Sequence, residues 1–189
     1  MKPLPLITIG LVALIAAAPG AASTPVSVPQ FDSINLKGGG HVVVRHGAVQ
    51  GVTLVSGNLE TTRFKVTHDG TLEIDACVRS CSNYRLEVEI VTPGLEGVGV
   101  EGGGEIRADG AFPDRDSLAI GIEGGGEIDM IAISAGAVAA GIEGGGTILA
   151  SARDRLVAGI EGGGTIRYRG DPTVTSGIEG GGSVSRIGE

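Results

Sequence analysis

Apolar and polar residues alternate with a period of two along much of the chain, which is typical of β-strands with one buried face. The clearest example is residues 63–75, "RFKVTHDGTLEID", in which two alternating segments flank Asp69-Gly70. Asp-Gly between such segments is a strong hairpin signal. Residues 84–91, "YRLEVEIV", place their aliphatic side chains on one face and their charges on the other. Residues 31–94 are therefore expected to form several short strands, some of them antiparallel.

A repeated hexad, Gly-Ile-Glu-Gly-Gly-Gly, dominates the second half of the chain. Its first glycine falls at 121, 141, 159 and 177, and a near-copy with Val starts at 99, so the intervals are 22, 20, 18 and 18 residues. Such a period is typical of repeat proteins in which each unit buries its apolar face against its neighbours. The residue before each Glu is aliphatic, and so is the second residue after the third Gly. These residues can point inward and stack in rows, while the first Gly and the Glu of each hexad point outward.

The glycine triplets decide between strand and helix. Each Gly in a helix interior costs roughly 1 kcal/mol relative to Ala, so a triplet in every repeat would break a helix. Glycine also permits the positive φ of a tight corner. We therefore predict an all-β fold, a parallel β-helix-like solenoid with an irregular, partly antiparallel N-terminal portion. It forms a single domain over residues 31–189, with the repeats at 95–189.

The N-terminal segment predicts export. Residues 1–23 have the parts of a signal peptide: Lys2, an apolar run over residues 4–18, and small residues before a cleavage site near Ala22 or Ser23. The apolar run is short for a membrane span, and no second run of that length follows. Residues 24–30 are interpreted as a flexible lead-in. The mature chain is expected to be soluble and to lie in the periplasm or at the cell surface.

Composition and charge narrow the class of partner. The chain has 35 glycines among 189 residues, 41% hydrophobic residues and 3% aromatic residues, a balance suited to short strands with an aliphatic core. It has 22 acidic and 14 basic residues, for a net charge of -8, which argues against a nucleic-acid partner because phosphates would repel it. Cys77 and Cys81 are expected to form a disulfide, since exported proteins reach an oxidising environment in which disulfides persist. The alternative is two free thiols.

Two outward rows are candidate functional surfaces. The Glu row is Glu101, Glu123, Glu143, Glu161 and Glu179, and the Gly row is Gly99, Gly121, Gly141, Gly159 and Gly177. If the repeats stack, neighbouring carboxylates lie about 4.8 Å apart and repel by about 1 kcal/mol in water. The Glu row is therefore a candidate ridge for divalent cations or a cationic partner; the alternative is that the carboxylates extend into water and are screened by salt. The Gly row could admit a second copy of the protein, or the glycines could merely relieve crowding near the corner.

The sequence gives less support to a calcium site, a phosphate-binding loop or a hydrolase active site. A calcium roll needs a carboxylate in each turn, but only Asp129 is present at the relevant position. No "GK[ST]" follows the triple glycines, so a phosphate loop is not predicted. Asp114, Asp116, Asp129 and Asp154 are the acids considered for a hydrolase, and their setting in mixed-charge connections favours solvated loops. No catalytic, metal or cofactor residues are assigned.

Several segments resemble one known family. "FDSINLKGGGHVVVRHG" (31–47), "VTHDGTLEI" (66–74) and "RYRGDPTVTSGIEGGGSVSRIG" (167–188) are similar to the head GIN domain family of autotransporter adhesins, and the likeness extends over residues 29–188. The resemblance implies a right-handed β-helix-like fold in secreted, periplasmic or surface proteins of bacteria, with no catalytic or ligand residues to carry over. Glu stands here where the family usually has Ser before the glycines.

The expected function is a non-enzymatic envelope protein that binds or adheres to an unknown surface ligand through a repetitive acidic surface. Two alternatives stay open. One is a polysaccharide-active enzyme on the same scaffold. The other is an envelope structural protein that assembles through its edge or its Gly row.

Overall fold

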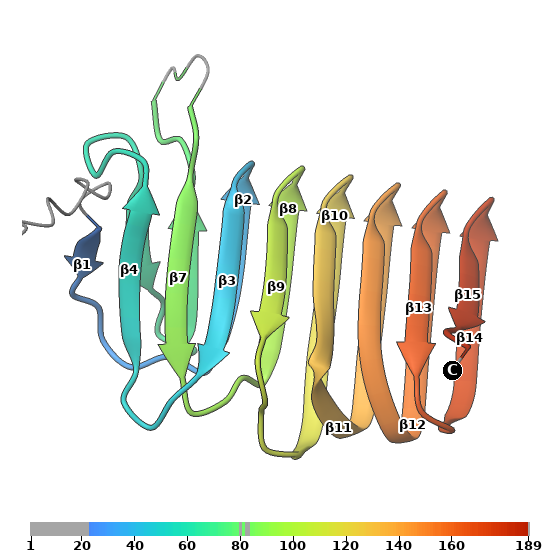
Figure 1. Cartoon of the computed structure of the whole chain (residues 1–189). Coiled ribbons are helices and arrows are strands. Elements are labelled where there is room, and N and C mark those ends of the chain that lie inside the picture. The colour runs from blue at the N-terminus through green and yellow to red at the C-terminus, as the bar shows by residue number, and fades with distance from the viewer. Residues whose placement is uncertain (1–22, 80, 82–83, 189) are drawn as a thin grey trace, which may run out of the picture.

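The computed structural model describes residues 23–79, 81 and 84–188, and this part of the chain is all-β, with no helix. The predicted signal peptide lies outside the described residues, except for Ser23. The strands form two facing layers (Figure 1). Their bounds are β1 (Thr24–Val26), β2 (Ser33–Gly38), β3 (His41–His46), β4 (Gly51–Ser56), β5 (Arg63–Val66), β6 (Thr71–Asp75), β7 (Glu87–Thr92), β8 (Gly97–Gly102), β9 (Glu105–Asp109), β10 (Arg115–Gly124), β11 (Glu127–Gly144), β12 (Thr147–Gly162), β13 (Thr165–Arg169), β14 (Thr173–Gly180) and β15 (Ser183–Arg186).

The hexads lie in register on successive parallel strands. β8, β10, β11, β12 and β14 pair in that order, and the first Gly of each hexad is paired with the first Gly of the next. The Glu residues are aligned in the same way. In the other layer, β9, β11, β12, β13 and β15 form a second parallel ladder. β11 and β12 are long because each passes from one layer into the other, with a register irregularity between Asp129 and Ser134.

Each Glu-Gly-Gly-Gly segment turns the chain from one layer into the other. β8 ends at Gly102 and β9 begins at Glu105, and the later repeats turn at the same place. Gly102, Gly124 and Gly162 have φ values of 121°, 116° and 118°, which L-residues rarely adopt. The corners are hydrogen-bonded to one another: the N–H of Gly125 donates to the carbonyl of Gly102 at 2.9 Å. The predicted glycine corner is therefore present.

The core lies between the two layers and consists of aliphatic rows. Ile122, Ile142 and Ile160, which precede the Glu residues, are each at most 2% exposed, while the Glu residues that follow them are exposed. On the other layer, Ile128 and Ile148 are fully buried. The predicted alternation of inward and outward rows is confirmed, and it directs the first Gly and the Glu of each hexad toward solvent.

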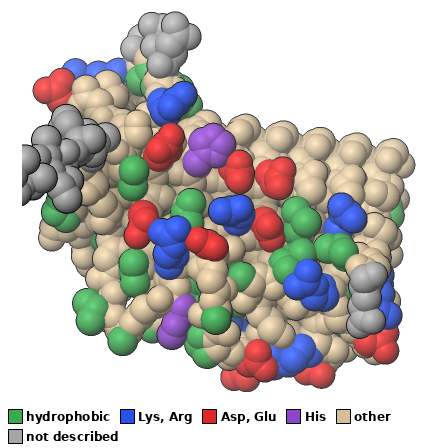
Figure 2. All heavy atoms as spheres, in the orientation of Figure 1, with side chains coloured by type: hydrophobic (Ala, Val, Ile, Leu, Met, Phe, Trp, Pro, Cys, Tyr) green, Lys and Arg blue, Asp and Glu red, His purple; other side chains and the backbone are tan. Residues whose placement is uncertain are grey.

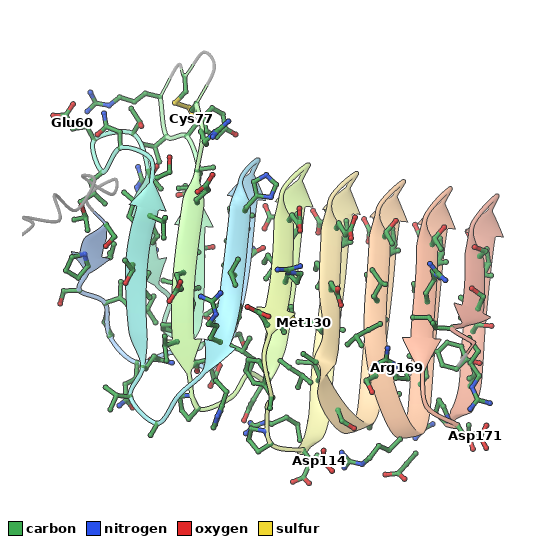
Figure 3. All side chains as sticks on the ribbon, in the orientation of Figure 1. Glu60, Cys77, Asp114, Met130, Arg169 and Asp171 are labelled. Carbon is green, nitrogen blue, oxygen red and sulfur yellow. A yellow bond between two sulfur atoms is a disulfide. The ribbon has the colours of Figure 1, made fainter. Side chains whose placement is uncertain are left out.

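The N-terminal portion makes the whole sheet a mixed one. β1 pairs antiparallel with β4, β4 with β7, and β5 with β6, while β2 and β3 join the parallel ladders. The predicted hairpin at residues 63–75 is β5–β6. The predicted disulfide between Cys77 and Cys81 is present, with 6.1 Å between the two Cα atoms. Figure 3 places Cys77 in a loop beyond the strand ends, away from the core.

Candidate functional site

The outer face of the layer containing the hexads carries a long shallow groove. It has a volume of about 820 Å³ and crosses β2, β8, β10, β11, β12 and β14. Its floor is the Gly row and one wall is the Glu row, with Asn35 closing the floor at the β2 end. We call it the acidic groove. The structure thus brings all five predicted Glu residues and all five predicted glycines into one surface.

Four of the five glycines of the floor are not required by the backbone or by packing; the exception is Gly99, where a Cβ would lie 3.0 Å from Asn35 Oδ1. Gly121, Gly141, Gly159 and Gly177 do not have positive φ values. A Cβ atom built at any of these four positions would meet no other atom within 4 Å. The explanation that the Gly row relieves crowding is therefore wrong at these positions. The corner glycines differ: a Cβ at Gly162 would lie 2.6 Å from the carbonyl oxygen of Gly144.

The Glu row is neutralised only at its β2 end. Glu101 accepts a hydrogen bond from Asn35 Nδ2 at 2.6 Å and lies 3.4 Å from Lys37 Nζ. Lys37 also lies 3.0 Å from Glu73. The pKa of Lys37 is raised, chiefly by its hydrogen bond to Glu73, although partial desolvation opposes the shift.

The remaining carboxylates of the row are Glu123, Glu143, Glu161 and Glu179, and none of them makes an ion pair with the basic residues described. Their backbones are on adjacent strands, about 4.8 Å apart. Each neighbouring pair repels by about 1 kcal/mol in water, and by more where the sheet surface lowers the local dielectric. The groove therefore has a line of negative charge that the protein leaves uncompensated.

The opposite side of the groove floor is apolar. The outward residues two positions before the glycines are Ala119, Ala139 and Val157, and they line a second shallow depression of about 720 Å³ that shares the Gly row. Val157 is 42% exposed. A ligand on the glycine floor would consequently meet carboxylates along one side and small aliphatic side chains along the other.

The other layer has a different electrostatic character. Figure 2 shows this face, on which acidic and basic side chains are interspersed. Arg45 lies 2.6 Å from Glu89 and 2.9 Å from Asp109, and these partners raise its pKa, the hydrogen bond to Asp109 most of all. Glu105, just after the first corner, contacts His41 Nδ1 at 3.0 Å. This face carries charges of both signs, whereas the wall of the groove carries carboxylates alone.

The carboxylates of the acidic groove lie in a line and do not surround a common point. Among the described residues, no three His, Cys, Asp or Glu side chains converge on a point where a metal ion could be held. Of the acids considered for a hydrolase, Asp116 and Asp154 flank Gly136, and Asp114 pairs with Arg153 at 3.1 Å beside them. Asp129 lies elsewhere and accepts a hydrogen bond from the N–H of Ile131 at 3.1 Å. No helix within the described part of the chain has the length and apolar character of a membrane span. The arrangement is suited to holding a ligand, with side chains presented in repeated, identical fashion.

Sequence reasoning missed the residues that close the groove. Asn35 and Lys37 lie 66 and 64 positions before Glu101, in a segment that lacks the hexad. Their only sequence signal is the "NLKGGG" of residues 35–40, whose glycines echo the repeat and place Asn35 in the Gly row and Lys37 in the Glu row.

One family model shows the family of the chain, and one solved structure supports its fold. The model of the family described as "Putative auto-transporter adhesin, head GIN domain" matches residues 30–116 and 114–172. A crystal structure of a "putative adhesin" from Bacteroides fragilis is similar over 88% of this chain and 96% of its own, with 17% identity and a TM-score of 0.53. Two others cover the same shares: a "putative adhesin" from Parabacteroides merdae (16% identity, TM-score 0.42) and a "Putative lipid binding protein" from Parabacteroides distasonis (17% identity, TM-score 0.37). A search of curated proteins found no match.

Proposed function

This chain belongs to the head GIN domain family of auto-transporter adhesins, and we propose from that premise that it is a non-enzymatic binding module of the bacterial cell envelope. Its acidic groove is the binding surface, and an extended cationic ligand is the partner. The family description supports a location outside the inner membrane, in the periplasm or at the cell surface.

One observation carries this proposal: the groove floor is open without structural need. Alanine would fit at Gly121, Gly141, Gly159 and Gly177 with no atom within 4 Å and no backbone strain. Glycine at such positions costs backbone entropy, roughly 0.5–1 kcal/mol each relative to Ala. A floor without side chains lets another molecule approach the backbone closely, and the free energy of that binding can offset the entropy cost.

The chemistry of the groove selects the ligand. From Glu101 to Glu179 the row spans about 19 Å, four steps of about 4.8 Å. A chain with cationic groups at short intervals would relieve the repulsion between the carboxylates, while its apolar stem would lie on the glycine and alanine strips. A single divalent cation fits less well, because the carboxylates do not converge.

Membership of this family also bears on how the chain winds through the two layers. We infer that the two parallel ladders wind as a right-handed β-helix-like solenoid, which the in-register hexads and the glycine corners support. In this arrangement every turn adds one carboxylate to the groove, so the number of repeats sets the length of ligand that can be held.

Calorimetric titration of the mature chain tests the function. Spermine serves as the extended cation and calcium chloride as the point cation, both at low ionic strength. The variant has four changes, Glu123→Gln, Glu143→Gln, Glu161→Gln and Glu179→Gln. The matched control, Glu60→Gln, Glu96→Gln, Asp116→Asn and Glu127→Gln, changes the net charge equally at exposed acids outside the groove.

We expect spermine to bind the native chain and the control, and the groove variant to lose at least tenfold in affinity, about 1.4 kcal/mol. Binding should weaken steeply with added salt because the contact is electrostatic. If the groove variant and the control lose the same affinity for spermine, the groove is not the binding site. Spermine would then respond only to the net charge of the protein.

A further inference from the structure

The edge strands at the two ends of the strand stack differ in length and in composition. At the N-terminal end the edge strands are β1 and β5, of three and four residues. β1 contains Pro25, and β5 carries Arg63 and Lys65. Short length, proline and charge are the devices by which natural proteins prevent an edge strand from pairing with another chain. Association through that end is therefore blocked.

In one of its two layers, the other end has a long strand without proline and with a single charged residue, Glu179. β14 has eight residues and pairs only with β12 within the described chain, so its second edge is open. Figure 1 shows β14 and β15 at the end of the stack. Val174 and Ile178 are 36% and 42% exposed, whereas Leu156 and Ile160, at the same positions one repeat earlier, are 0% and 1% exposed. A long apolar edge of this kind is an association surface.

β15, in the second layer, is protected. It pairs only with β13 and ends at Arg186, which is aligned with Tyr168 of the preceding repeat. Arg186 lies 3.2 Å from Asp171, and a charged residue at such a position opposes further strand pairing. The open surface is consequently confined to β14.

We propose that β14 pairs with β14 of a second copy of this chain, antiparallel about a two-fold axis. With Ser176 at the axis, Ile178 of each copy is placed opposite Val174 of the other, and Glu179 opposite Thr173. The two copies of Glu179 are therefore not opposed, as they would be if the parallel Glu row continued. A two-fold contact is also closed, because each copy uses the same edge.

The size of the contact fits a reversible dimer. A strand of eight residues is about 26 Å long, and the layers lie about 10 Å apart. This end therefore has an area of about 260 Å² on each copy, about 520 Å² for the two, which is small for a specific interface and is expected for a weak, transient dimer. Dimerisation is independent of the proposed cationic ligand, and it is measured with the protein alone.

Sedimentation velocity over a range of concentrations tests the dimer, with two matched variants. Ile178→Lys and Val157→Lys each place a lysine at a side chain that is 42% exposed, the first at the open edge and the second on the outer face of β12. We expect a monomer–dimer equilibrium that Ile178→Lys weakens at least tenfold, as expected for loss of a central apolar contact, and that Val157→Lys leaves unchanged. Circular dichroism of both variants checks that they fold.

A disulfide trap tests the register. Ser176→Cys adds the only free thiol among the described residues, because Cys77 and Cys81 are bonded to each other. Directly opposed residues of antiparallel strands lie about 4.5–5.5 Å apart at Cα, within disulfide range, so oxidation should give a covalent dimer. Four results would each overturn the proposal: a strict monomer at high concentration, assemblies larger than a dimer, a dimer broken by Val157→Lys but not by Ile178→Lys, or no covalent dimer on oxidation.

Discussion

Replacing Gly162 by alanine tests whether the glycine corners hold the repeats together. Gly162 has a φ of 118°, and a Cβ there would lie 2.6 Å from the carbonyl oxygen of Gly144 in the preceding corner. That carbonyl accepts a hydrogen bond from the N–H of Gly163 at 2.9 Å. The substitution therefore strains the backbone and pushes apart two corners that are hydrogen-bonded.

The magnitude follows from these two effects. Holding a non-glycine residue at such a φ costs about 1–3 kcal/mol, and weakening one hydrogen bond between corners costs about 1 kcal/mol more. We expect Gly162→Ala to lower the free energy of unfolding by about 2–4 kcal/mol. With a urea m-value of about 2 kcal/mol/M, the midpoint falls by about 1–2 M.

The neighbouring glycine supplies the control. Gly163 lacks a positive φ, and a Cβ there meets nothing within 4 Å. Gly163→Ala should leave stability unchanged or raise it by up to about 1 kcal/mol, because alanine restricts the unfolded chain. Urea unfolding followed by circular dichroism measures both variants. If the two variants shift the midpoint equally, the corner conformation is not what requires glycine.

Three further outcomes are expected. Glu143→Gln removes two repulsions of about 1 kcal/mol each within the Glu row and should stabilise the protein by up to about 2 kcal/mol at about 10 mM salt. The gain in urea midpoint should vanish in about 0.5 M salt, and a gain unaffected by salt contradicts this reasoning. The pKa of Asp69 is lowered, chiefly by a hydrogen bond from the Thr67 hydroxyl, so its contribution to stability is present above about pH 4 and is lost as the pH falls through the folded pKa. Asp69→Asn should therefore narrow the difference between the urea midpoints at pH 7 and pH 3. An unchanged difference would show that Asp69 does not contribute to the pH dependence of stability. Changing Cys77 and Cys81 to serine opens a loop of sequence separation 4 and should cost at most about 2 kcal/mol in thermal or urea unfolding, with a larger loss showing that the disulfide supports the fold.

The repeats were predictable because their pattern is local. Alternation with a period of two fixes which face each side chain takes, so Ile122 and Glu123 had to point to opposite sides of one strand. An identical hexad in every repeat then leaves little choice of register, since a shift by one residue would turn the isoleucines outward. The glycine corner, the buried rows and the exposed Glu row follow from these two facts.

The groove could be predicted only in part. The Glu row and the Gly row were both expected, but the reason for the glycines was not, because only coordinates show whether a Cβ would meet a neighbour. A Cβ at the corner glycine Gly102 would lie 2.8 Å from the Gly38 carbonyl oxygen, whereas the crowding explanation, made for the Gly row, fails at Gly121, where the space is open. The same residue type, in the same hexad, serves two different purposes.

The sequence by itself determined the strands of the repeats, their faces and the alignment of the hexads, because each depends on residues close together in the chain or on their exact repetition. It did not reveal β1, whose residues Thr24–Val26 lie in the segment interpreted as a flexible lead-in and pair with β4. Only the tertiary structure decided that Lys37 pairs with Glu101 and Asn35 donates a hydrogen bond to it, and that β14 has an unpaired edge at one end of the stack. These features arise from contacts between segments far apart in sequence, and no local period encodes such contacts.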